Sequence, residues 1–362
     1  MNNNKIRLLV IIIFCIFISC NNENDRIMNY NKYALIDLHL HIDGSLPIKT
    51  IIKCAKIEGI HLPTEDSIEL KKYLTVSENC TDLNEYLKCF SLPISVMQSK
   101  ESLSLCAYDL VKELNSQGLI YAELRFAPQF HCKKGLTQDN VTNAIIEGMK
   151  KAENEGEIKT NLILCCMRGS KVEDNIETIE IAKKYHQKGV VAIDLAGAEA
   201  IFPTSDYKNI FSKAKELGLP YTIHAGEADG AKSITSALDF GALRLGHGIR
   251  SLESQDIIKR EKKDNIILEL CPTSNLQTKA ISSLKEYPIP EFIKANVLCT
   301  INTDNMTVSG TTLENEFKIL FEAGLIDKNT AKQLVLNSAK AAFINDSEKE
   351  ILLKKVKAIL NY

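Results

Sequence analysis

The sequence lacks any concentrated run of lysine or arginine, and the formal net charge of its 362 residues is only −2. A nucleic-acid-binding face needs a concentrated basic patch, so this absence argues against such a partner and favours a small molecule. The remaining composition is ordinary, with 45% hydrophobic and 25% charged residues. A chain of this size can bury a sizeable core in one large domain or two small ones.

Cysteine is present, but its spacing fits neither a disulfide framework nor a thiolate metal site. Of the 11 cysteines, the 9 beyond Cys20 form an odd set without repeated spacing and without a Cys-x-x-Cys pair. Paired spacings are what a disulfide framework or a structural zinc site would require. Cysteines in apolar runs are expected to pack as small hydrophobic side chains. This applies to Cys165, Cys166, Cys271 and Cys299.

The N-terminal segment has an apolar run, Leu8 to Ile18, that falls well short of the roughly 20 residues needed to cross a bilayer. Lys5 and Arg7 precede this run, and Ser19, Cys20 and a polar stretch follow it. This profile predicts a secretory signal peptide. The alternatives are a transmembrane anchor, which the length disfavours, and a buried helix, which the absence of an amphipathic pattern disfavours.

The small residue before Cys20 resembles the lipobox of bacterial lipoproteins, in which the cysteine becomes the lipidated N-terminus. We therefore expect a signal peptide at 1–19, a polar linker at 20–33 and one domain at 34–362. The mature protein would be exported and anchored by lipid at Cys20, on the periplasmic or cell-surface side, without spanning the membrane. Many unpaired cysteines are unusual for an oxidising compartment, a tension that an anaerobic habitat would relieve.

Beyond the linker, no low-complexity segment or charge run divides the chain. Short apolar runs alternate with longer amphipathic stretches, such as 209–220. This alternation predicts an α/β fold with a parallel sheet covered by helices, and the count of runs predicts a (β/α)8 TIM barrel. The eight runs are 34–40, 119–126, 161–167, 190–197, 220–224, 243–247, 265–271 and 296–303.

The interval 44–118 is too long for one connection, so it must contain extra helices after the first strand. Within it, the segment 83–97 is either a lid over the barrel mouth or ordinary helical packing.

Polar residues end several of the apolar runs, and the active site of a parallel barrel lies at the C-terminal ends of its strands. His39 and His41 close the first run. Side chains two residues apart on a strand point to the same side, so both imidazoles can face the mouth. Alone, such a pair fits surface or capping histidines as well as half of a zinc site.

The other run ends favour the metal. His224 ends the fifth run, His247 ends the sixth, and Asp304 follows the eighth. Three histidines and one aspartate around zinc leave room for a water whose pKa falls to about 7, which predicts a hydrolase. Barrels that bind two metal ions usually bridge them with a lysine at the end of the fourth strand. The fourth run here ends at residues 194–197 without a lysine, so we expect one Zn²⁺ per chain.

Glu227 lies three residues after His224 and would face the same cavity. Burial there would raise the pKa of its carboxyl and keep a proton available for donation. The alternative is a solvated loop carboxylate or a helix N-cap partner.

The sequence resembles the adenosine/adenine deaminase family, and within it the bacterial adenosine deaminases. The resemblance lies in seven segments that occur in order between about residues 35 and 315: DLHLHIDGSL, LIYAELRFAP, VVAIDLAGAE, YTIHAGE, RLGHGI, ELCPTSN and INTDN. It implies zinc-dependent hydrolysis that replaces the 6-amino group of adenosine or 2′-deoxyadenosine with oxygen, as in purine salvage. The zinc motif of cytidine deaminases is absent.

The resemblance also implies roles for individual residues. Glu227 matches the acid that protonates the purine ring nitrogen next to the reacting carbon, and His247 matches the residue that orients the metal's water and helps deprotonate it. The positions that match the zinc ligands are His39, His41, His224 and Asp304.

Substrate contacts follow from the same resemblance. Asp43 matches the acid that meets a ribose hydroxyl, the backbone amide of Gly197 matches a purine contact, and His41 faces the substrate as well as the metal. Asn305 departs from the Asp-Asp version of the last motif, but its amide can donate to the purine N7 at any pH. Ala198 and the pair 287–288 also depart from the common pattern without removing a catalytic group.

Three further charged residues end or lie in strand-like runs, and we expect them to form a buried structural network beneath the site. They are Glu123, Arg125 and Arg168.

Three other functions compete with this one. A deaminase could act on adenine or on another 6-aminopurine derivative such as an aminofutalosine-type nucleoside, although the match of Asp43 favours a ribose-bearing substrate. An inert nucleoside-binding or surface lipoprotein would be expected to have damaged ligand positions, and none is damaged. An amide- or lactone-cleaving amidohydrolase is disfavoured by Glu227 and by the missing bridging lysine.

Overall fold

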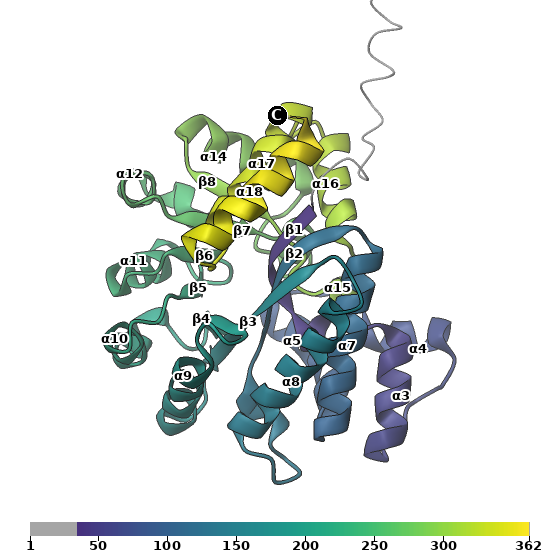
Figure 1. The fold of residues 1–362 in the computed structure, drawn as a ribbon. Coiled ribbons are helices and arrows are strands. Elements are labelled where there is room, and N and C mark those ends of the chain that lie inside the picture. Colours follow the sequence, from purple (N-terminus) through teal and green to yellow (C-terminus); the bar gives the residue numbers. More distant parts are fainter. Residues whose placement is uncertain (1–34, 362) are drawn as a thin grey trace, which may run out of the picture.

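The computed structural model describes residues 35–361, in which eight parallel strands form a barrel with helices outside it (Figure 1). The strands pair in chain order within two sets of four, and every pairing is parallel. The strands are β1 (Leu35–His41), β2 (Leu119–Phe126), β3 (Lys159–Met167), β4 (Val190–Ala196), β5 (Thr222–Ala225), β6 (Arg244–His247), β7 (Ile267–Leu270) and β8 (Leu298–Ile301).

Two single bridges join these sets of strands into a closed barrel. Ile193 of β4 pairs with Tyr221 just before β5, and Leu40 of β1 pairs with Asp304 just after β8. At the second seam, the N–H of His41 donates to the Asp304 carbonyl at 2.7 Å, and the N–H of Asp304 donates to the His39 carbonyl at 2.8 Å. The predicted TIM barrel is confirmed, and its first and last strands meet at residues predicted to bind metal.

Each predicted apolar run overlaps one strand, and the bounds of run and strand differ by at most two residues. The run 220–224 begins with Pro220, which has no N–H to donate to a neighbouring strand, and β5 starts at Thr222. The strands are almost entirely buried, as expected for parallel strands between a packed barrel interior and a layer of helices.

The longer helices alternate with the strands or follow the last one. The helix predicted in 209–220 is present and ends before Gly218, whose positive φ of 67° suits a helix end. These helices are α7 (Lys100–Ser116), α8 (Gln138–Glu153), α9 (Val172–Tyr185), α10 (Lys208–Glu216), α11 (Ala231–Phe240), α12 (Gln255–Asp264), α14 (Ile289–Ala295), α16 (Leu313–Glu322), α17 (Lys328–Ala341) and α18 (Asp346–Leu360).

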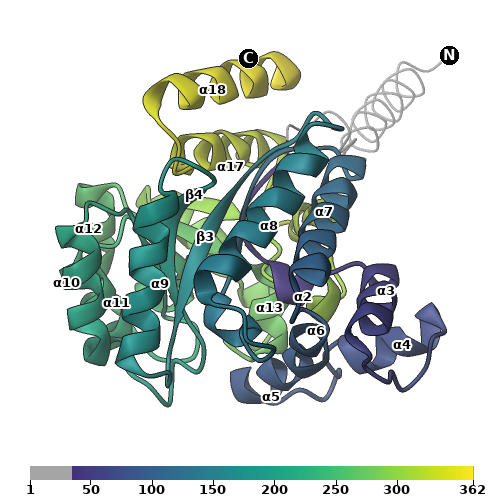
Figure 2. The same ribbon diagram turned by 60° about the horizontal axis from the view of Figure 1, so that its bottom comes forward.

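The interval after β1 contains the extra helices that were predicted. They are α2 (Ile42–Ser45), α3 (Ile48–Glu58), α4 (Ser67–Leu74), α5 (Leu83–Leu87), the 3₁₀ helix η2 (Lys88–Phe90) and α6 (Ser91–Ser95). Helices α5 and α6 lie at the opposite end of the barrel from α18 (Figure 2). The short elements elsewhere are η3 (Pro128–His131), η4 (Thr204–Tyr207), η5 (Ile249–Glu253), α13 (Pro272–Gln277), η6 (Leu284–Glu286) and α15 (Met306–Ser309).

The predicted signal peptide and linker lie outside the described residues. Among residues 35–361, no helix is both long and apolar enough to cross a membrane. The nine cysteines in this range are free thiols, and the four expected to be buried are buried.

Candidate active site

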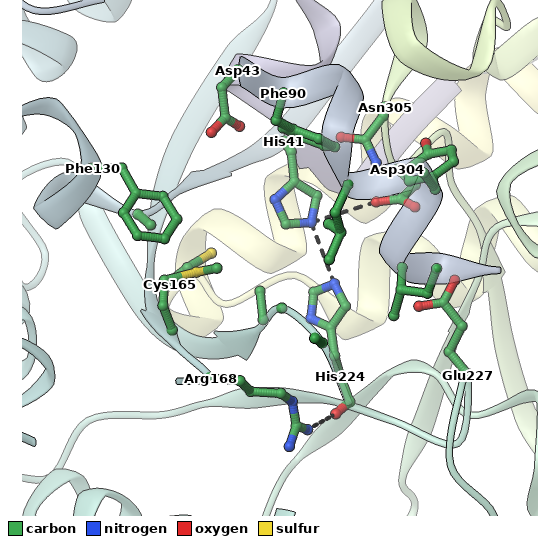
Figure 3. Close-up of a pocket in the computed structure, with 18 of the residues that line it drawn as sticks. His41, Asp43, Phe90, Phe130, Cys165, Arg168, His224, Glu227, Asp304 and Asn305 are labelled. Atoms are coloured by element: carbon green, nitrogen blue, oxygen red, sulfur yellow. Dashed lines mark hydrogen bonds and ion pairs between the residues drawn. The ribbon is translucent and has the colours of Figure 1, made fainter. Parts of the chain in front are cut away.

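A cavity of about 290 Å³, here called the mouth cavity, opens at the C-terminal ends of the strands. One wall is apolar and comes from the segment 83–97, including Leu83, Leu87 and Phe90. The cavity is also lined by polar residues from strand ends and the loops after them, among them His41 and Glu227 (Figure 3). The segment 83–97 therefore covers the mouth, which is the lid position that the sequence left open.

Four imidazoles and one carboxylate surround a single buried space at the base of the mouth cavity. The ring centroids of His39 and His224 lie 4.5 Å apart, and those of His41 and His224 lie 5.3 Å apart. Oδ1 of Asp304 lies 3.3 Å from Nε2 of His39 and 3.4 Å from Nε2 of His41. The sequence predicted that these residues meet although they come from different strands, and the structure brings them together.

Two buried carboxylates fix the orientation of two of these histidines. Nδ1 of His39 lies 2.8 Å from Oε2 of Glu269, and Nδ1 of His224 lies 2.9 Å from Oδ2 of Asp194. Burial alone would raise the pKa of both carboxyls, but neighbouring positive charge, including that of Arg125, holds each pKa well below its ordinary value. Ionised carboxylates accept the Nδ1 protons, so each Nε2 presents a lone pair to the shared space.

A network of two guanidinium groups supports these carboxylates from below. Arg125 donates to Oδ2 of Asp194 at 3.0 Å and to Oε2 of Glu269 at 2.9 Å. Arg244 contacts the other oxygen of Glu269 and also Glu123, each at 2.6 Å. The predicted charge network beneath the site is confirmed for Glu123 and Arg125.

Arg168 is different from what the sequence predicted. Its guanidinium donates to the carbonyls of Phe202 and His224, at 2.7 and 2.6 Å, and to the hydroxyl of Thr204 at 2.9 Å. It contacts backbone at the barrel mouth, so it does not belong to the carboxylate network below. The reason is its position directly after β3, from which its guanidinium reaches the carbonyl of His224 in β5, the strand beyond β4.

The donor set around the shared space fits a divalent metal ion. Nε2 of His39 is buried without a hydrogen-bond partner, and Nε2 of His224 lies 3.3 Å from Nε2 of His41. Lone pairs that converge with an aspartate oxygen in a buried space require a cation between them. Four candidate ligand groups lie within 4.8 Å of one another, those of His39, His224, His247 and Asp304. His41 in turn contacts His224 and Asp304.

The neighbours of His247 separate it from the ligands. The hydroxyl of Tyr287 donates to Oδ1 of Asn275 at 3.0 Å, which turns the amide nitrogen of Asn275 toward Nδ1 of His247, also at 3.0 Å. Burial lowers the pKa of His247 well below its ordinary value, so the ring is neutral. A neutral ring that accepts at Nδ1 holds its proton on Nε2, and this nitrogen then has no lone pair for a metal. For the same reason it cannot take a proton from water, so His247 can orient the water, but the predicted help in deprotonating it is wrong.

Glu227 lies beside this cluster with its carboxyl buried. Thr278 donates its hydroxyl to Oε1 at 3.0 Å, and Oε2 lies 3.4 Å from Nε2 of His247. Burial, together with the charges of Asp304 and Glu199, raises the pKa of Glu227 well above its ordinary value. A raised pKa favours the protonated form of this carboxyl. Because the side chain is buried, the alternative of a solvated loop carboxylate is wrong.

The residues predicted to contact substrate all line the mouth cavity. Oδ1 of Asp43 is buried without a partner, and burial raises the pKa of this carboxyl to about 7. Gly197 has a φ of 105°, a conformation that excludes ordinary side chains and leaves its backbone open to the cavity. A Cβ on Gly44 would collide with Oδ1 of Asn305, so this glycine leaves room for the Asn305 amide.

Two of the site residues have a strained backbone conformation. His247 and Asp304 follow or end short strands and have φ values of 62° and 60°, in the left-handed region that non-glycine residues seldom adopt. Such conformations persist where the surrounding structure enforces them, and they are common at functional sites.

The sequence did not assign roles to Asp194, Glu269 and Glu199. The first two are carboxylates inside otherwise apolar strand runs, and this could have marked them as partners of buried cations or histidines. Glu199 lies in the loop after β4, and no local pattern indicates its contacts with the loop after β5.

Comparison with known proteins agrees with this geometry. The sequence profile of the family described as adenosine deaminase matches residues 34–359. A curated adenosine deaminase from Haemophilus ducreyi is 45% identical over 335 residues, which make up 91% of this chain and 97% of that protein.

Two crystal structures share the fold over most of the chain. One is an adenine deaminase from Arthrobacter aurescens, with a TM-score of 0.82 and 27% identity over 91% of this chain and 100% of that one. The other is an N6-mAMP deaminase from Arabidopsis, with a TM-score of 0.81 and 25% identity over the same shares of the two chains.

Proposed function

The chain belongs to the adenosine deaminase family, and we propose that it converts adenosine and 2′-deoxyadenosine to inosine and 2′-deoxyinosine by zinc-dependent hydrolysis that releases ammonia. The observation that carries this proposal is the arrangement around the mouth cavity. A protonated carboxyl, that of Glu227, adjoins a buried cluster of histidines and one aspartate. Hydrolytic deamination of a purine needs both a nucleophilic water and a proton donor to the ring.

We assign zinc as the metal, with His39, His41, His224 and Asp304 as its ligands. Imidazole nitrogens together with one carboxylate are a common set of ligands for catalytic zinc. Histidines that bind zinc through one ring nitrogen typically donate from the other to a carboxylate, as His39 does to Glu269 and His224 to Asp194. When bound, zinc supplies a Lewis acid that lowers the pKa of a coordinated water to about 7.

The remaining steps belong to side chains of this chain. Glu227, with Oε1 accepting from Thr278, holds its proton on Oε2 and donates it to the ring nitrogen next to the reacting carbon. His247 orients the attacking water by donating from Nε2, the atom that its contact with Asn275 leaves protonated. Of the two protons of this water, one restores the acid form of Glu227 and the other leaves with the amino group as ammonia. The apolar wall of the segment 83–97 excludes bulk water, which strengthens these interactions.

A nucleoside fits the mouth cavity better than a nucleotide does. Among the lining residues that the structure describes, Arg168 is the only one with an ammonium or guanidinium group, and it is held by two backbone carbonyls and Thr204. A 5′-phosphate would find no free cation there. The unpartnered oxygen of Asp43 supplies an acceptor for a ribose hydroxyl, which free adenine would leave without a partner.

An ultraviolet assay of the purified, zinc-loaded protein tests this function. Adenosine and 2′-deoxyadenosine should be consumed with much higher kcat/KM than adenine or adenosine 5′-monophosphate. Conversion of adenine alone would make the chain an adenine deaminase, and faster conversion of the monophosphate would reject the substrate argument based on Arg168.

We also propose that the protein is exported as a lipoprotein anchored at Cys20, where it salvages nucleosides outside the cytoplasm. The basic start, the short apolar run and the small residue before Cys20 support this proposal. Cys20→Ala should move the protein from the membrane fraction to the soluble fraction of the cell. Unchanged fractionation would contradict lipidation while leaving the enzymatic proposal untouched.

A further inference from the structure

The carboxylate of Glu199 binds the loop that carries Glu227. Oε2 accepts the backbone N–H groups of Glu227, Ala228 and Asp229 at 3.0, 2.7 and 3.1 Å. Oε1 accepts the N–H of Gly226 at 2.6 Å and the hydroxyl of Ser233. Four consecutive backbone N–H groups thus form an anion-binding nest, and the anion bound in it is the side chain of Glu199.

The path of this loop makes the contact necessary. Gly226 has a φ of 79°, and a Cβ there would lie 2.5 Å from the side chain of Ile234, so the loop is both tight and closely packed. Its four N–H groups point away from any strand or helix partner. Gly226 and Glu227 are buried, so without an acceptor their N–H groups would each cost free energy comparable to a lost hydrogen bond. Ala228 and Asp229 are half-buried.

Other contacts hold the same loop from the opposite side. Nε of Arg250 donates to the carbonyl of Glu227 at 3.2 Å, and the N–H of Arg250 donates to the carbonyl of Gly226 at 3.2 Å. The N–H of Glu227 is bound by Glu199 and its carbonyl by Arg250. The backbone of the proton donor is therefore fixed on both sides, while its carboxyl contacts the side chains of Thr278 and His247.

Glu199 is itself held by a chain of polar contacts that reaches the end of β5. The hydroxyl of Ser233 bridges Glu199 and the hydroxyl of Thr204, the latter at 2.7 Å. Thr204 accepts from Arg168 at 2.9 Å, and Arg168 donates to the carbonyl of His224 at 2.6 Å. The same group of residues thus fixes the strand end that bears a metal ligand and the loop that bears the proton donor.

We propose that Glu199 is a positioning residue for the deamination, which fixes the backbone of residues 226–229 so that the carboxyl of Glu227 faces the purine ring. This inference rests on the proposed function. Glu199 touches neither substrate nor metal ligand; it acts through Glu227. The alternative is that it only stabilises the start of α11, which follows the loop and contains Ser233.

Steady-state kinetics of Glu199→Ala distinguishes these roles. Displacement of a reacting group by about 1 Å can cost on the order of 100-fold in rate, so kcat should fall by about that factor while KM changes by less than about threefold. Zinc content should stay at one ion per chain. Glu199→Asp, which keeps the charge on a shorter stem, should recover part of the lost kcat, whereas a kcat equal to wild type in Glu199→Ala would overturn the proposal.

A double-mutant cycle with Glu227→Gln tests whether Glu199 affects kcat through Glu227. If Glu199 acts through Glu227, the Glu199→Ala change should cost little further activity when Glu227 is already replaced. An equal loss in both backgrounds would mean a general structural role and would reject the positioning role. A wild-type protein that does not deaminate adenosine at all would instead reject the proposed function, so the two failures are distinguishable.

Hydrogen exchange gives a readout that needs no turnover. The amides of residues 226–229 should exchange at least tenfold faster in Glu199→Ala than in wild type, while amides of the barrel strands keep their rates. Unchanged exchange in this loop would show that Glu199 does not fix the backbone of residues 226–229. If Glu199→Ala does not fold, Ser233→Ala, which removes one of the five contacts, should give smaller changes of the same kind in exchange and in kcat.

Glu153 provides a matched control. Its carboxylate also accepts a backbone N–H and a hydroxyl, both from Thr160, but at the start of β3 and so at the far end of the barrel from the mouth cavity. Glu153→Gln should leave kcat, KM and the exchange of residues 226–229 as in wild type. A fall in kcat equal to that of Glu199→Ala would show that loss of any carboxylate contact with the backbone has this effect, and would overturn the proposal.

Discussion

Nδ1 of His224 lies 2.9 Å from Oδ2 of Asp194, and both groups are buried. Asp194 is held in turn by Arg125, which also holds the equivalent partner of His39. One guanidinium therefore orients two imidazoles from different strands. The orientation of these histidines is therefore set by contacts below the mouth cavity.

Asp194→Asn should weaken zinc binding. The amide has no negative charge to stabilise the Nδ1 proton of His224, and loss of such a partner typically costs about 10- to 100-fold in metal affinity. Competition with a chromophoric chelator measures this affinity. Asp206→Asn, an exposed carboxylate on η4, is the control, and equal affinity in Asp194→Asn and wild type would contradict the role of Asp194.

Glu227→Gln should bind zinc normally but lose most of its activity. The amide fills the same space without an acidic proton, and general acid catalysis is typically worth about 10²- to 10⁴-fold in rate. Adenosine turnover and metal content are measured on the same preparation. Glu216→Gln, an exposed position on α10, should be fully active. Wild-type turnover in Glu227→Gln would remove Glu227 from the reaction.

Asp43→Ala should reduce the preference for nucleosides over free adenine. A hydrogen bond to a charged group contributes about 1.5 to 3 kcal/mol, so kcat/KM for adenosine should fall by about 10- to 100-fold while the value for adenine changes little. The ratio of the two kcat/KM values is the measurement. A proportional loss for both substrates would indicate damage to the site instead of loss of a ribose contact.

Glu261 on α12 gives the protein a pH-dependent stability term. It is buried, accepts from the hydroxyl of Ser251 at 2.6 Å, and burial raises its pKa from 4.5 to about 7. Below pH 4.5 the carboxyl is protonated in both the folded and the unfolded chain, and its contribution is fully present. As pH rises through 7 this contribution is lost, by an amount on the order of 3 kcal/mol.

The comparison of Glu261→Gln with wild type isolates this term, because the amide does not titrate. The unfolding midpoint of wild type relative to the variant should decrease between pH 5 and pH 8. Glu314→Gln, an exposed position on α16, should show a constant difference from wild type over this range. A constant difference for Glu261→Gln as well would show that its carboxyl is not destabilised by burial.

The sequence predicted the barrel and the grouping of site residues because both depend on local pattern. Apolar runs of strand length give the strands, and a parallel barrel brings the end of every run to one face. His39, His224 and Asp304 could therefore be placed together without knowledge of any contact between strands.

The roles that depend on contacts across the barrel could not be predicted in this way. Whether His41 or His247 completes the ligand set depends on which nitrogen bears a proton, and for His247 this is decided by Asn275, 28 positions away in the sequence. Arg168 was placed in the wrong network because its partners are backbone carbonyls, which leave no signal in the sequence. The contacts of Glu199 with residues 226–229 likewise depend on two loops being adjacent in space.

The seam between β1 and β8 has a consequence for how the protein is made. The N–H of Asp304 bonds to the carbonyl of His39, so ligands from the first and last strands adjoin only after the sheet has closed. A ribosome-bound chain that still lacks β8 cannot assemble the full set. Metal acquisition is therefore a late event in biogenesis, and uptake of the ion reports that the two ends of the barrel have met.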